Sequence, residues 1–358
     1  MAVDKKKVSK IVIGALTGFS GAMVASALIA YDTIFKRYDR PDYNLYPGMY
    51  NIDRFNGTLY REEVYFPSNG VKLKGYYYPA LNPKGLIVIA HGLHAGGDDY
   101  LPMVEYLVKN NYNIFNYNVQ GTYESEGEDC VGMCQSLIDL ESALTFLENT
   151  PPYSYMPICL IGHSWGGYAV SSVLSIKKNI KACACIAPMN SGADMMVEKG
   201  EQYVGKLATM PAPVINLYQK HLFNGYTKFN GVKGINSTNV PIIIAQGVTD
   251  KIITYDGQSI TAHKKELRTE NVYYYDGFGP QGDHNNIWHS VEAAVYQDVV
   301  KSKLKLLEIE KGEKLTYDEK TEFYKTIDHN LYSQVNKELF DFIIKTFDKA
   351  LYPALLTD

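Results

Sequence analysis

The sequence predicts an α/β fold in which a mostly parallel β-sheet is covered by helices on both faces. Short, continuous apolar runs recur along the 358-residue chain, and helix-length segments separate them. Apolar strands that alternate with helices are typical of a parallel sheet whose two faces are both buried. The chain length and the 46% hydrophobic content are sufficient for one large core of this kind.

The predicted sheet begins with an antiparallel hairpin. Residues 60–66 and 71–78 are rich in β-branched and aromatic residues, and Asn69-Gly70 between them is typical of a tight turn. The parallel strands are expected at residues 85–90, 113–117, 158–162, 182–187, 241–245 and 272–275. The intervening and terminal helices are expected at residues 100–110, 136–148, 167–177 and 340–351.

Residues 190–239 interrupt this alternation. The segment is too long for an ordinary loop inside a compact domain, so we expect a small helical cap insertion there. Its methionine and aromatic residues suit either an acyl-chain pocket or simple packing of the cap onto the body. The predicted organisation is an N-terminal segment (1–31), a linker (32–58) and one domain with its cap insertion (59–358).

The N-terminal segment has the character of a membrane helix. Residues 11–31 carry no charge and are long enough to cross a hydrocarbon core about 30 Å thick. Lysines at positions 5, 6, 7 and 10 favour a cytoplasmic N-terminus, although basic residues at 36, 37 and 40 oppose this orientation. Ala25-Ser26-Ala27 resembles a signal-peptidase site, so a cleaved secretory signal is the alternative. We favour a transmembrane anchor with the main domain outside the cytoplasm, because the apolar run exceeds the ~7–15 residues of a signal-peptide core.

Composition excludes some partners. The net charge is −4 and no basic stripe is present, so we expect no nucleic-acid partner. The five cysteines form no framework, and Cys130 and Cys134 lack the further ligands that a metal site needs. We therefore expect no bound metal.

The strongest motif is Gly162-His163-Ser164-Trp165-Gly166, between a predicted strand and a predicted helix. A serine hydroxyl becomes a useful nucleophile when a sharp strand-to-helix turn exposes it and a base takes its proton. Gly162 and Gly166 leave room for such a turn. The motif therefore predicts that Ser164 is a catalytic nucleophile.

With this motif, the chain from residue 59 to the C-terminus resembles the α/β-hydrolase superfamily, and most closely its lysophospholipase, monoacylglycerol-lipase and serine-aminopeptidase-like branch. His91-Gly92-Leu93, after the strand at 85–90, resembles the family's oxyanion loop. The resemblance implies that the backbone N–H groups of Leu93 and Trp165 stabilise an oxyanion. A glycine-rich turn with structural histidines is the alternative.

The stretch at residues 118–127 also resembles a family motif, D-x-R-G-x-G-x-S-x-G. Gly121, Ser125 and Gly127 fit this pattern, whereas Asn118, Gln120 and Tyr123 depart from it. The departures remove an aspartate and an arginine, so we do not expect the ion pair that the resemblance to the family would imply here. They do not affect the residues proposed for catalysis.

The acid and the base of a catalytic triad are expected after two late strands. Asp250 follows the strand at 241–245 and would orient an imidazole; Asp194 and Asp256 are weaker candidates. His284 follows the last strand on a glycine-rich loop and would act as the base. His289 is the second choice, whereas His329 is more distant. The order Ser164, Asp250, His284 is the order of this fold.

These residues predict a serine hydrolase that cleaves a carboxylic ester, lipid-like or with a small acyl group, without a cofactor. A serine peptidase of the same fold is the alternative, and an acidic cluster in the cap formed by Asp194, Glu198 and Glu201 would favour it. A catalytically silent, membrane-anchored binding protein is the alternative of another class. The sequence does not predict the oligomeric state.

Overall fold

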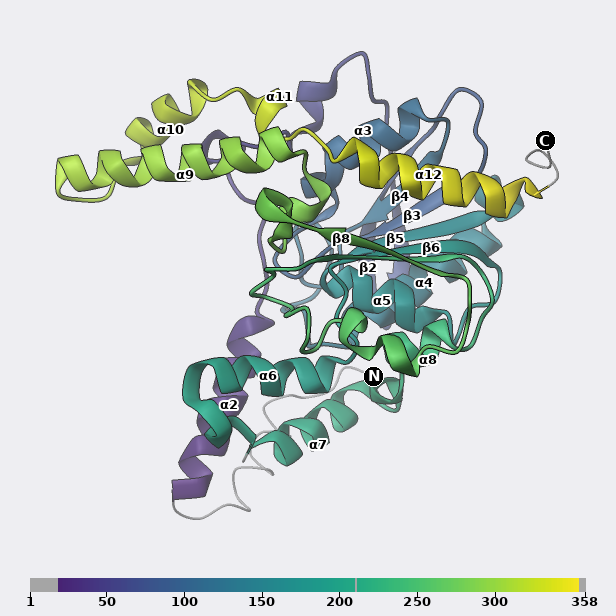
Figure 1. Cartoon of the computed structure of the whole chain (residues 1–358), viewed down its shortest axis with the longest axis horizontal. Helices are drawn as coiled ribbons and strands as arrows, with labels where there is room; N and C mark the ends of the chain where they lie inside the picture. The colour runs from purple at the N-terminus through teal and green to yellow at the C-terminus, as the bar shows by residue number, and fades with distance from the viewer. Residues whose placement is uncertain (1–18, 210, 354–358) are drawn as a thin grey trace.

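The computed structural model describes residues 19–209 and 211–353 and contains an eight-stranded sheet (Figure 1). The strand order is β1-β2-β4-β3-β5-β6-β7-β8. Strand β2 is antiparallel to both of its neighbours and the remaining pairs are parallel, so the predicted mostly parallel sheet is confirmed. The strands are β1 (Glu62–Ser68), β2 (Val71–Tyr78), β3 (Leu86–Ala90), β4 (Asn113–Tyr117), β5 (Ile158–His163), β6 (Ile180–Ile186), β7 (Ile242–Gly247) and β8 (Val272–Gly277).

The hairpin between β1 and β2 is formed by the turn residues that the sequence supplies. Asn69 and Gly70 have φ values of 46° and 92°. A two-residue turn with positive φ at both positions matches the right-handed twist of the strands it joins. The register pairs Ser68 with Val71 directly across this turn.

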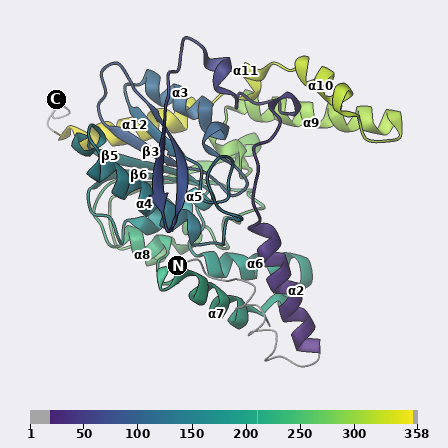
Figure 2. The same ribbon diagram turned by 180° about the vertical axis from the view of Figure 1, so that it is seen from behind.

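Helices cover both faces of the sheet (Figures 1 and 2). One face carries α3 (Leu101–Lys109) and α12 (Lys337–Leu351), and the other carries α4 (Gln135–Asn149) and α5 (Trp165–Val173). Strand β3 is buried along its whole length, and its side chains alternate between the two apolar cores. This double burial explains why the parallel strands are continuous apolar runs.

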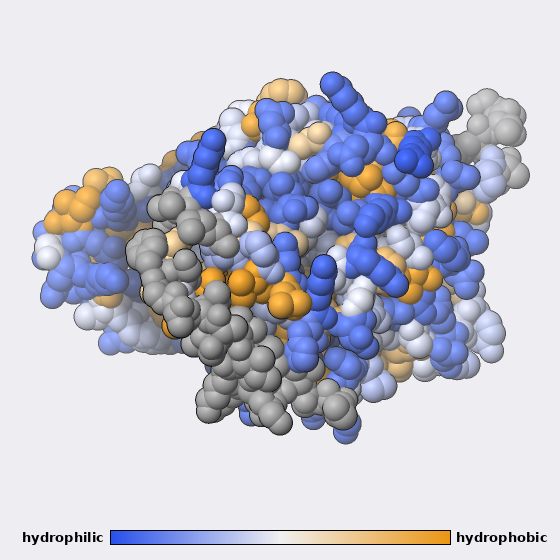
Figure 3. All heavy atoms as spheres, turned by 90° about the horizontal axis from the view of Figure 1, so that it is seen from below, coloured by the Kyte–Doolittle hydropathy of each residue, from blue (hydrophilic) through white to orange (hydrophobic). Residues whose placement is uncertain are grey.

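A helical insertion lies between β6 and β7, in the region where the sequence predicts a cap. It consists of α6 (Gly192–Val204), α7 (Ala212–Phe223) and α8 (Gly231–Ile235). Helix α8 packs on α5 of the body, whereas α6 and α7 lie further out, next to the N-terminal helix α2 (Phe19–Ile34) (Figures 1 and 2). The face of the molecule on the cap side is mainly hydrophilic, with a few hydrophobic residues near its middle (Figure 3).

The predicted transmembrane helix is not supported. Residues 11–18 lie outside the described residues, and within 19–209 and 211–353 no helix is both long and apolar enough to cross a membrane. Val24, Leu28 and Tyr31 share one face of α2, which is buried against the protein. Tyr31 packs edge-on against Tyr218 of α7, with ring centroids 5.7 Å apart. Val24, Leu28 and Tyr31 therefore form a packing surface, a use that hydropathy alone does not distinguish from membrane insertion.

Three further helices follow β8 and project from the body beside the sheet (Figure 1). They are α9 (Val291–Lys311), α10 (Tyr317–Lys325) and α11 (His329–Tyr332). Helix α9 begins at the N-cap Ser290, whose hydroxyl accepts from the N–H of Ala293. Helices α6 and α11 lie on opposite sides of the region where strands β5 and β8 end (Figures 1 and 2).

Candidate active site

Ser164 occupies a strained turn between β5 and α5. Its φ and ψ are 57° and −115°, in a region that side-chain-bearing residues rarely adopt. A Cβ on Gly162 would lie 2.2 Å from the carbonyl oxygen of Gly166, and one on Gly166 would lie 2.0 Å from that of Ala90. Only glycine fits at either position, so these two residues permit the turn that presents the serine hydroxyl.

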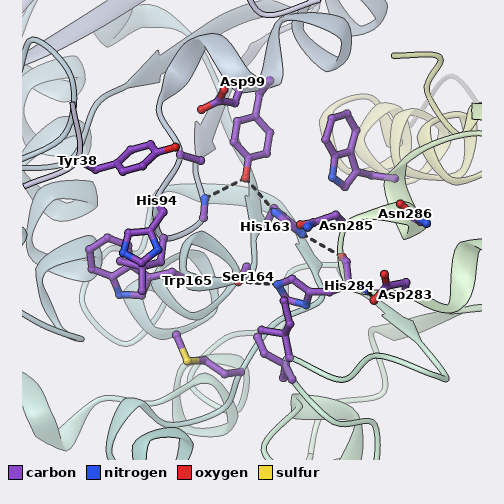
Figure 4. A pocket seen from close by; sticks show the side chains of 18 of the residues that line it. Tyr38, His94, Asp99, His163, Ser164, Trp165, Asp283, His284, Asn285 and Asn286 are labelled. Carbon is purple, nitrogen blue, oxygen red and sulfur yellow. Dashed lines mark hydrogen bonds between the residues drawn. The ribbon is translucent and has the colours of Figure 1, made fainter. Parts of the chain in front are cut away.

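The structure brings Ser164, His284 and Asp250 into one hydrogen-bonded chain. Figure 4 shows the Ser164 and His284 part of it. The Oγ of Ser164 lies 2.9 Å from Nε2 of His284, and Nδ1 of His284 lies 2.7 Å from Oδ2 of Asp250. Asp250 and His284 are both 4% exposed. A buried carboxylate that accepts from Nδ1–H leaves Nε2 free to accept the serine proton, which is the arrangement that activates a serine.

Asp250 is fixed by donors other than the imidazole. Its Oδ1 accepts from the backbone N–H groups of Ile252 (2.7 Å) and Ile253 (2.9 Å). Its Oδ2 accepts from Nε2 of Gln246 at 2.9 Å in addition to His284. The loops that carry the acid and the base are also joined, because the N–H of residue 249 donates to the carbonyl of residue 282 at 3.0 Å. The carboxylate is therefore held in one orientation.

A second hydrogen-bonded chain positions the loop of His284. The Nε2 of His163 faces the carbonyl oxygen of His284 at 3.2 Å, so it must carry the proton and donate. Its Nδ1 is then an acceptor for the hydroxyl of Tyr100 at 2.9 Å, and that hydroxyl accepts from the N–H of Gly92 at 2.9 Å. Burial lowers the pKa of His163 to about 3, which keeps the ring neutral as these bonds require.

The predicted oxyanion donors come from two segments, Leu93 from the loop after β3 and Trp165 from the start of α5. His91 donates from Nδ1 to the carbonyl of Gly92 (2.8 Å) and accepts at Nε2 from the N–H of Val119 (2.9 Å). Burial lowers the pKa of His91 to about 4, so it is a neutral structural residue. The N–H of Gly92 is used by Tyr100, whereas the N–H groups of Leu93 and Trp165 have no acceptor within residues 19–209 and 211–353. Leu93 and Trp165 line the same cavity as Ser164.

This cavity has a volume of about 630 Å³ and extends from the cap past Ser164 to α11. At the cap end its lining is mainly apolar: Phe35, Met133, Met189, Met195, Met196, Ile252 and Ile253. At the other end the lining is aromatic and polar: Tyr46, Tyr50, Asp99, Trp288, His289, Gln297 and Tyr332. The two halves of a substrate that reacts at Ser164 would thus meet different surroundings.

The other candidates from the sequence lie apart from this chain of residues. Asp194 lies near the start of α6 and Asp256 is exposed; neither contacts His284. His289 lies between a short 3-10 helix and the N-cap of α9, and burial lowers its pKa to about 3. His329 bonds the carbonyl of Pro47. None of these residues is placed to replace Asp250 or His284.

Sequence reasoning missed several residues of the site. Tyr100, Gln246 and Asp99 lie at the cavity or bond the triad, yet none belongs to a recognisable motif. His163 lies within the Ser164 motif, and its hydrogen bonds to Tyr100 and to the carbonyl of His284 show that it supports the loop of the base. A buried polar residue within a strand, such as Gln246, was the one available signal, because such groups need hydrogen-bond partners.

Comparisons with known proteins support the architecture. The family described as serine aminopeptidase, S33, matches residues 81–232, which include Leu93 and Ser164 but not Asp250 or His284. Two crystal forms of the esterase Pf2001 from Pyrococcus furiosus superpose with a TM-score of 0.52. One is 19% identical and covers 73% of this chain and 95% of its own; the other is 18% identical and covers 77% and 98%. These matches show that the chain has the α/β-hydrolase fold.

Relatives by sequence carry no functional name. The uncharacterized protein YfhR of Salmonella typhi is 22% identical over 245 residues, which cover 65% of this α/β-hydrolase and 77% of YfhR. YfhR of Escherichia coli K12 is 24% identical over 182 residues, which cover 45% and 63%. The substrate of this α/β-hydrolase must therefore be inferred from its own site.

Proposed function

We propose that the protein is a serine hydrolase that cleaves a carboxylic ester through an acyl-enzyme on Ser164. The observation that carries this proposal is the chain Ser164–His284–Asp250, with separations of 2.9 Å and 2.7 Å. The two unpaired N–H groups of Leu93 and Trp165 support it, since a tetrahedral intermediate needs donors at its oxyanion.

The reaction proceeds in two steps. His284 accepts the proton of Ser164 while the serine oxygen attacks the ester carbonyl, and the N–H groups of Leu93 and Trp165 donate to the oxyanion. The imidazolium, stabilised by Asp250, then protonates the departing alcohol. Water enters, gives a proton to His284 and attacks the acyl-enzyme, which releases the acid and restores Ser164.

The apolar end of the cavity supports an acyl group of lipid-like character. Met195 and Met196 come from α6 of the cap and Met189 from the loop before it. Methionine side chains adapt to flexible chains, and an apolar lining favours burial of hydrocarbon. We therefore expect medium-length acyl esters to be better substrates than acetyl esters.

A serine peptidase remains the second candidate, because the matching family is described as a serine aminopeptidase. The acidic cluster that would favour it is not part of the cavity lining: Asp194, Glu198 and Glu201 are absent from it. Glu198 instead accepts from the hydroxyl of Thr254 at 2.5 Å. The assembled triad also argues against a catalytically silent binding protein.

The test is labelling with a fluorophosphonate, followed by mass spectrometry of the modified peptide. Wild type should be labelled on Ser164, and Ser164→Ala and His284→Ala should not be labelled. Ser142→Ala is the matched control, since Ser142 lies on α4 and bonds only Ser68 and its own helix. Folded wild type that is neither labelled nor active on any ester or aminoacyl amide would refute the proposal.

A further inference from the structure

The polar end of the cavity contains a carboxylate without a cation. Asp99 follows the oxyanion loop, and its Oδ2 accepts from the N–H of Gly96 (2.7 Å) and the hydroxyl of Tyr123 (2.6 Å). Asp99 is partly exposed, and both of these hydrogen bonds are made by Oδ2. Within residues 19–209 and 211–353, no Lys, Arg or His lies within ion-pair distance of it, although Arg40 is near enough to lower its pKa. A buried carboxylate is stabilised when a positive charge lies beside it.

Neighbouring basic residues are committed elsewhere. Arg40 pairs with Asp98 at 2.6 Å and also with Glu124, while Arg61 pairs with Asp98 at 2.7 Å. Lys301 lines the cavity but is 61% exposed and lies 3.5 Å from Asp298 on its own helix. Asp99 and Asp283 are the two carboxylates among the residues that line the cavity, and Asp99 is the one that follows the oxyanion loop.

Aromatic rings line the same cavity as this carboxylate. The lining includes Tyr38, Tyr46, Tyr50, Tyr100 and Tyr332. Of these, Tyr38, Tyr50 and Tyr100 are near enough to Asp99 to interact with its charge. Figure 4 shows Asp99 and Tyr38 on the same side of Ser164. The faces of tyrosine rings attract cations, and aromatic walls combined with a carboxylate suit protonated amines and quaternary ammonium groups.

Tyr123, whose hydroxyl donates to Asp99, is one of the residues at which the stretch 118–127 departs from the family motif. Tyr123 stands where that pattern has glycine, and it has a positive φ of 49°. Its ring packs so closely on Gly96 that a Cβ there would lie 2.2 Å from it. A residue that adopts an unfavourable backbone conformation to hold one carboxylate oxygen indicates that the orientation of Asp99 matters.

We propose that the Asp99 end of the cavity binds a cationic nitrogen, a protonated amine or a quaternary ammonium group, in the alcohol half of the ester. This inference rests on the proposed function of Ser164. The cap end of the cavity is apolar and suits the acyl chain, whereas Asp99 belongs to the other end, so the alcohol half that leaves Ser164 extends toward Asp99.

The experiment compares two esters that differ only in charge: octanoylcholine and its neutral isostere, 3,3-dimethylbutyl octanoate. Octanoyl esters of dimethylaminoethanol form a third arm, which separates an amine from a quaternary ammonium. For wild type, kcat/KM should favour the cationic esters by about tenfold or more. Asp99→Asn keeps an oxygen for Gly96 and Tyr123 but removes the charge, so the ratio of kcat/KM between the cationic and the neutral ester should fall to about one.

Asp341→Asn is the matched control, because it removes one negative charge on α12, where Asp341 bonds Tyr106. Its preference should equal that of wild type. If Asp99→Asn does not fold, inhibition of wild type provides the second measurement. Choline should compete with the neutral ester, and 3,3-dimethylbutan-1-ol should compete at least about tenfold less well.

Three outcomes would overturn the inference while leaving the hydrolase intact. They are equal rates on the charged and neutral esters, equal loss of both activities in Asp99→Asn, and a preference for aminoacyl esters of apolar alcohols. Absence of hydrolysis of every ester together with absence of fluorophosphonate labelling would instead refute the proposed function itself.

Discussion

Replacing Asp250 by asparagine changes the charge and the hydrogen-bonding groups of the side chain while keeping its shape. Two backbone N–H groups, those of Ile252 and Ile253, point at Oδ1. The amide oxygen of asparagine must take this place, because the NH₂ group there would face two donors. The NH₂ group then occupies the position of Oδ2, where it faces Nδ1 of His284 and Nε2 of Gln246.

The consequence is the wrong tautomer of the base. With a donor opposite Nδ1, His284 accepts at Nδ1 and carries its proton on Nε2, so it donates to Ser164 and cannot take the serine proton. In a Ser-His-Asp triad the same replacement lowers kcat by about 10⁴-fold. That factor corresponds to about 5 kcal/mol of the activation barrier.

The assay is steady-state hydrolysis of a p-nitrophenyl octanoate ester together with fluorophosphonate labelling. Asp250→Asn should lose both activities to this extent, and circular dichroism should report an unchanged fold. The matched control is Asp256→Asn, since Asp256 is exposed and lies on the same loop without touching the imidazole. An Asp250→Asn enzyme within tenfold of wild type would refute the assigned geometry.

Three further predictions concern the supports of the site. Gly166→Ala places a Cβ 2.0 Å from the backbone of β3, so it should destabilise the fold by about 1–3 kcal/mol in urea unfolding and abolish labelling; a stable, labelled variant would contradict this. His163→Phe removes the ring N–H that donates to the carbonyl oxygen of His284, so the loop that carries this base loses a support. The value of kcat should therefore fall by about tenfold or more with little change in KM. Burial lowers the pKa values of His91, His163 and His289 to about 4, 3 and 3, below the unfolded value near 6.5. The unfolded chain therefore takes up protons first, and each of these residues should reduce the free energy of unfolding by about 2 kcal/mol between pH 7 and pH 5. Burial raises the pKa values of Asp99 and Asp139 to about 6, so these two carboxyl groups take up protons first in the folded state. Each offsets about 1 kcal/mol of the loss in the free energy of unfolding. Unfolding curves that coincide at the two pH values would contradict the burial of neutral imidazoles.

The parts of the site that the sequence could predict all follow apolar strands. Ser164, Asp250 and His284 come after β5, β7 and β8. In an open parallel sheet the carboxyl ends of neighbouring strands lie at one edge, so residues that follow them converge even when they are far apart in the sequence. Strand periodicity and motif order together were sufficient to select these three residues.

The Asp99 end of the cavity could not be predicted in this way. Tyr46, Tyr50 and Tyr332 come from irregular segments and a four-residue helix, separated from one another by up to 286 positions. No periodicity reports which face such segments present, and 30 tyrosines in the chain make any single one uninformative. Their convergence depends on tertiary packing that a single sequence does not encode in a readable pattern.

The segment predicted to be a linker proves to contribute to the cavity, and this changes how the domain should be delimited. Ile34, Phe35, Tyr38, Tyr46 and Tyr50 all line it. The indole of Trp165 donates to the carbonyl of Met133 at 2.7 Å. Its ring also packs on Phe35, with ring centroids 6.0 Å apart. A chain that began at residue 59, where the strand pattern predicts the start of the domain, would retain the triad but lose one wall of the cavity. Because binding energy from parts of the substrate remote from the reacting carbonyl orients that carbonyl, such a chain should lose selectivity between esters before it loses the reactive serine.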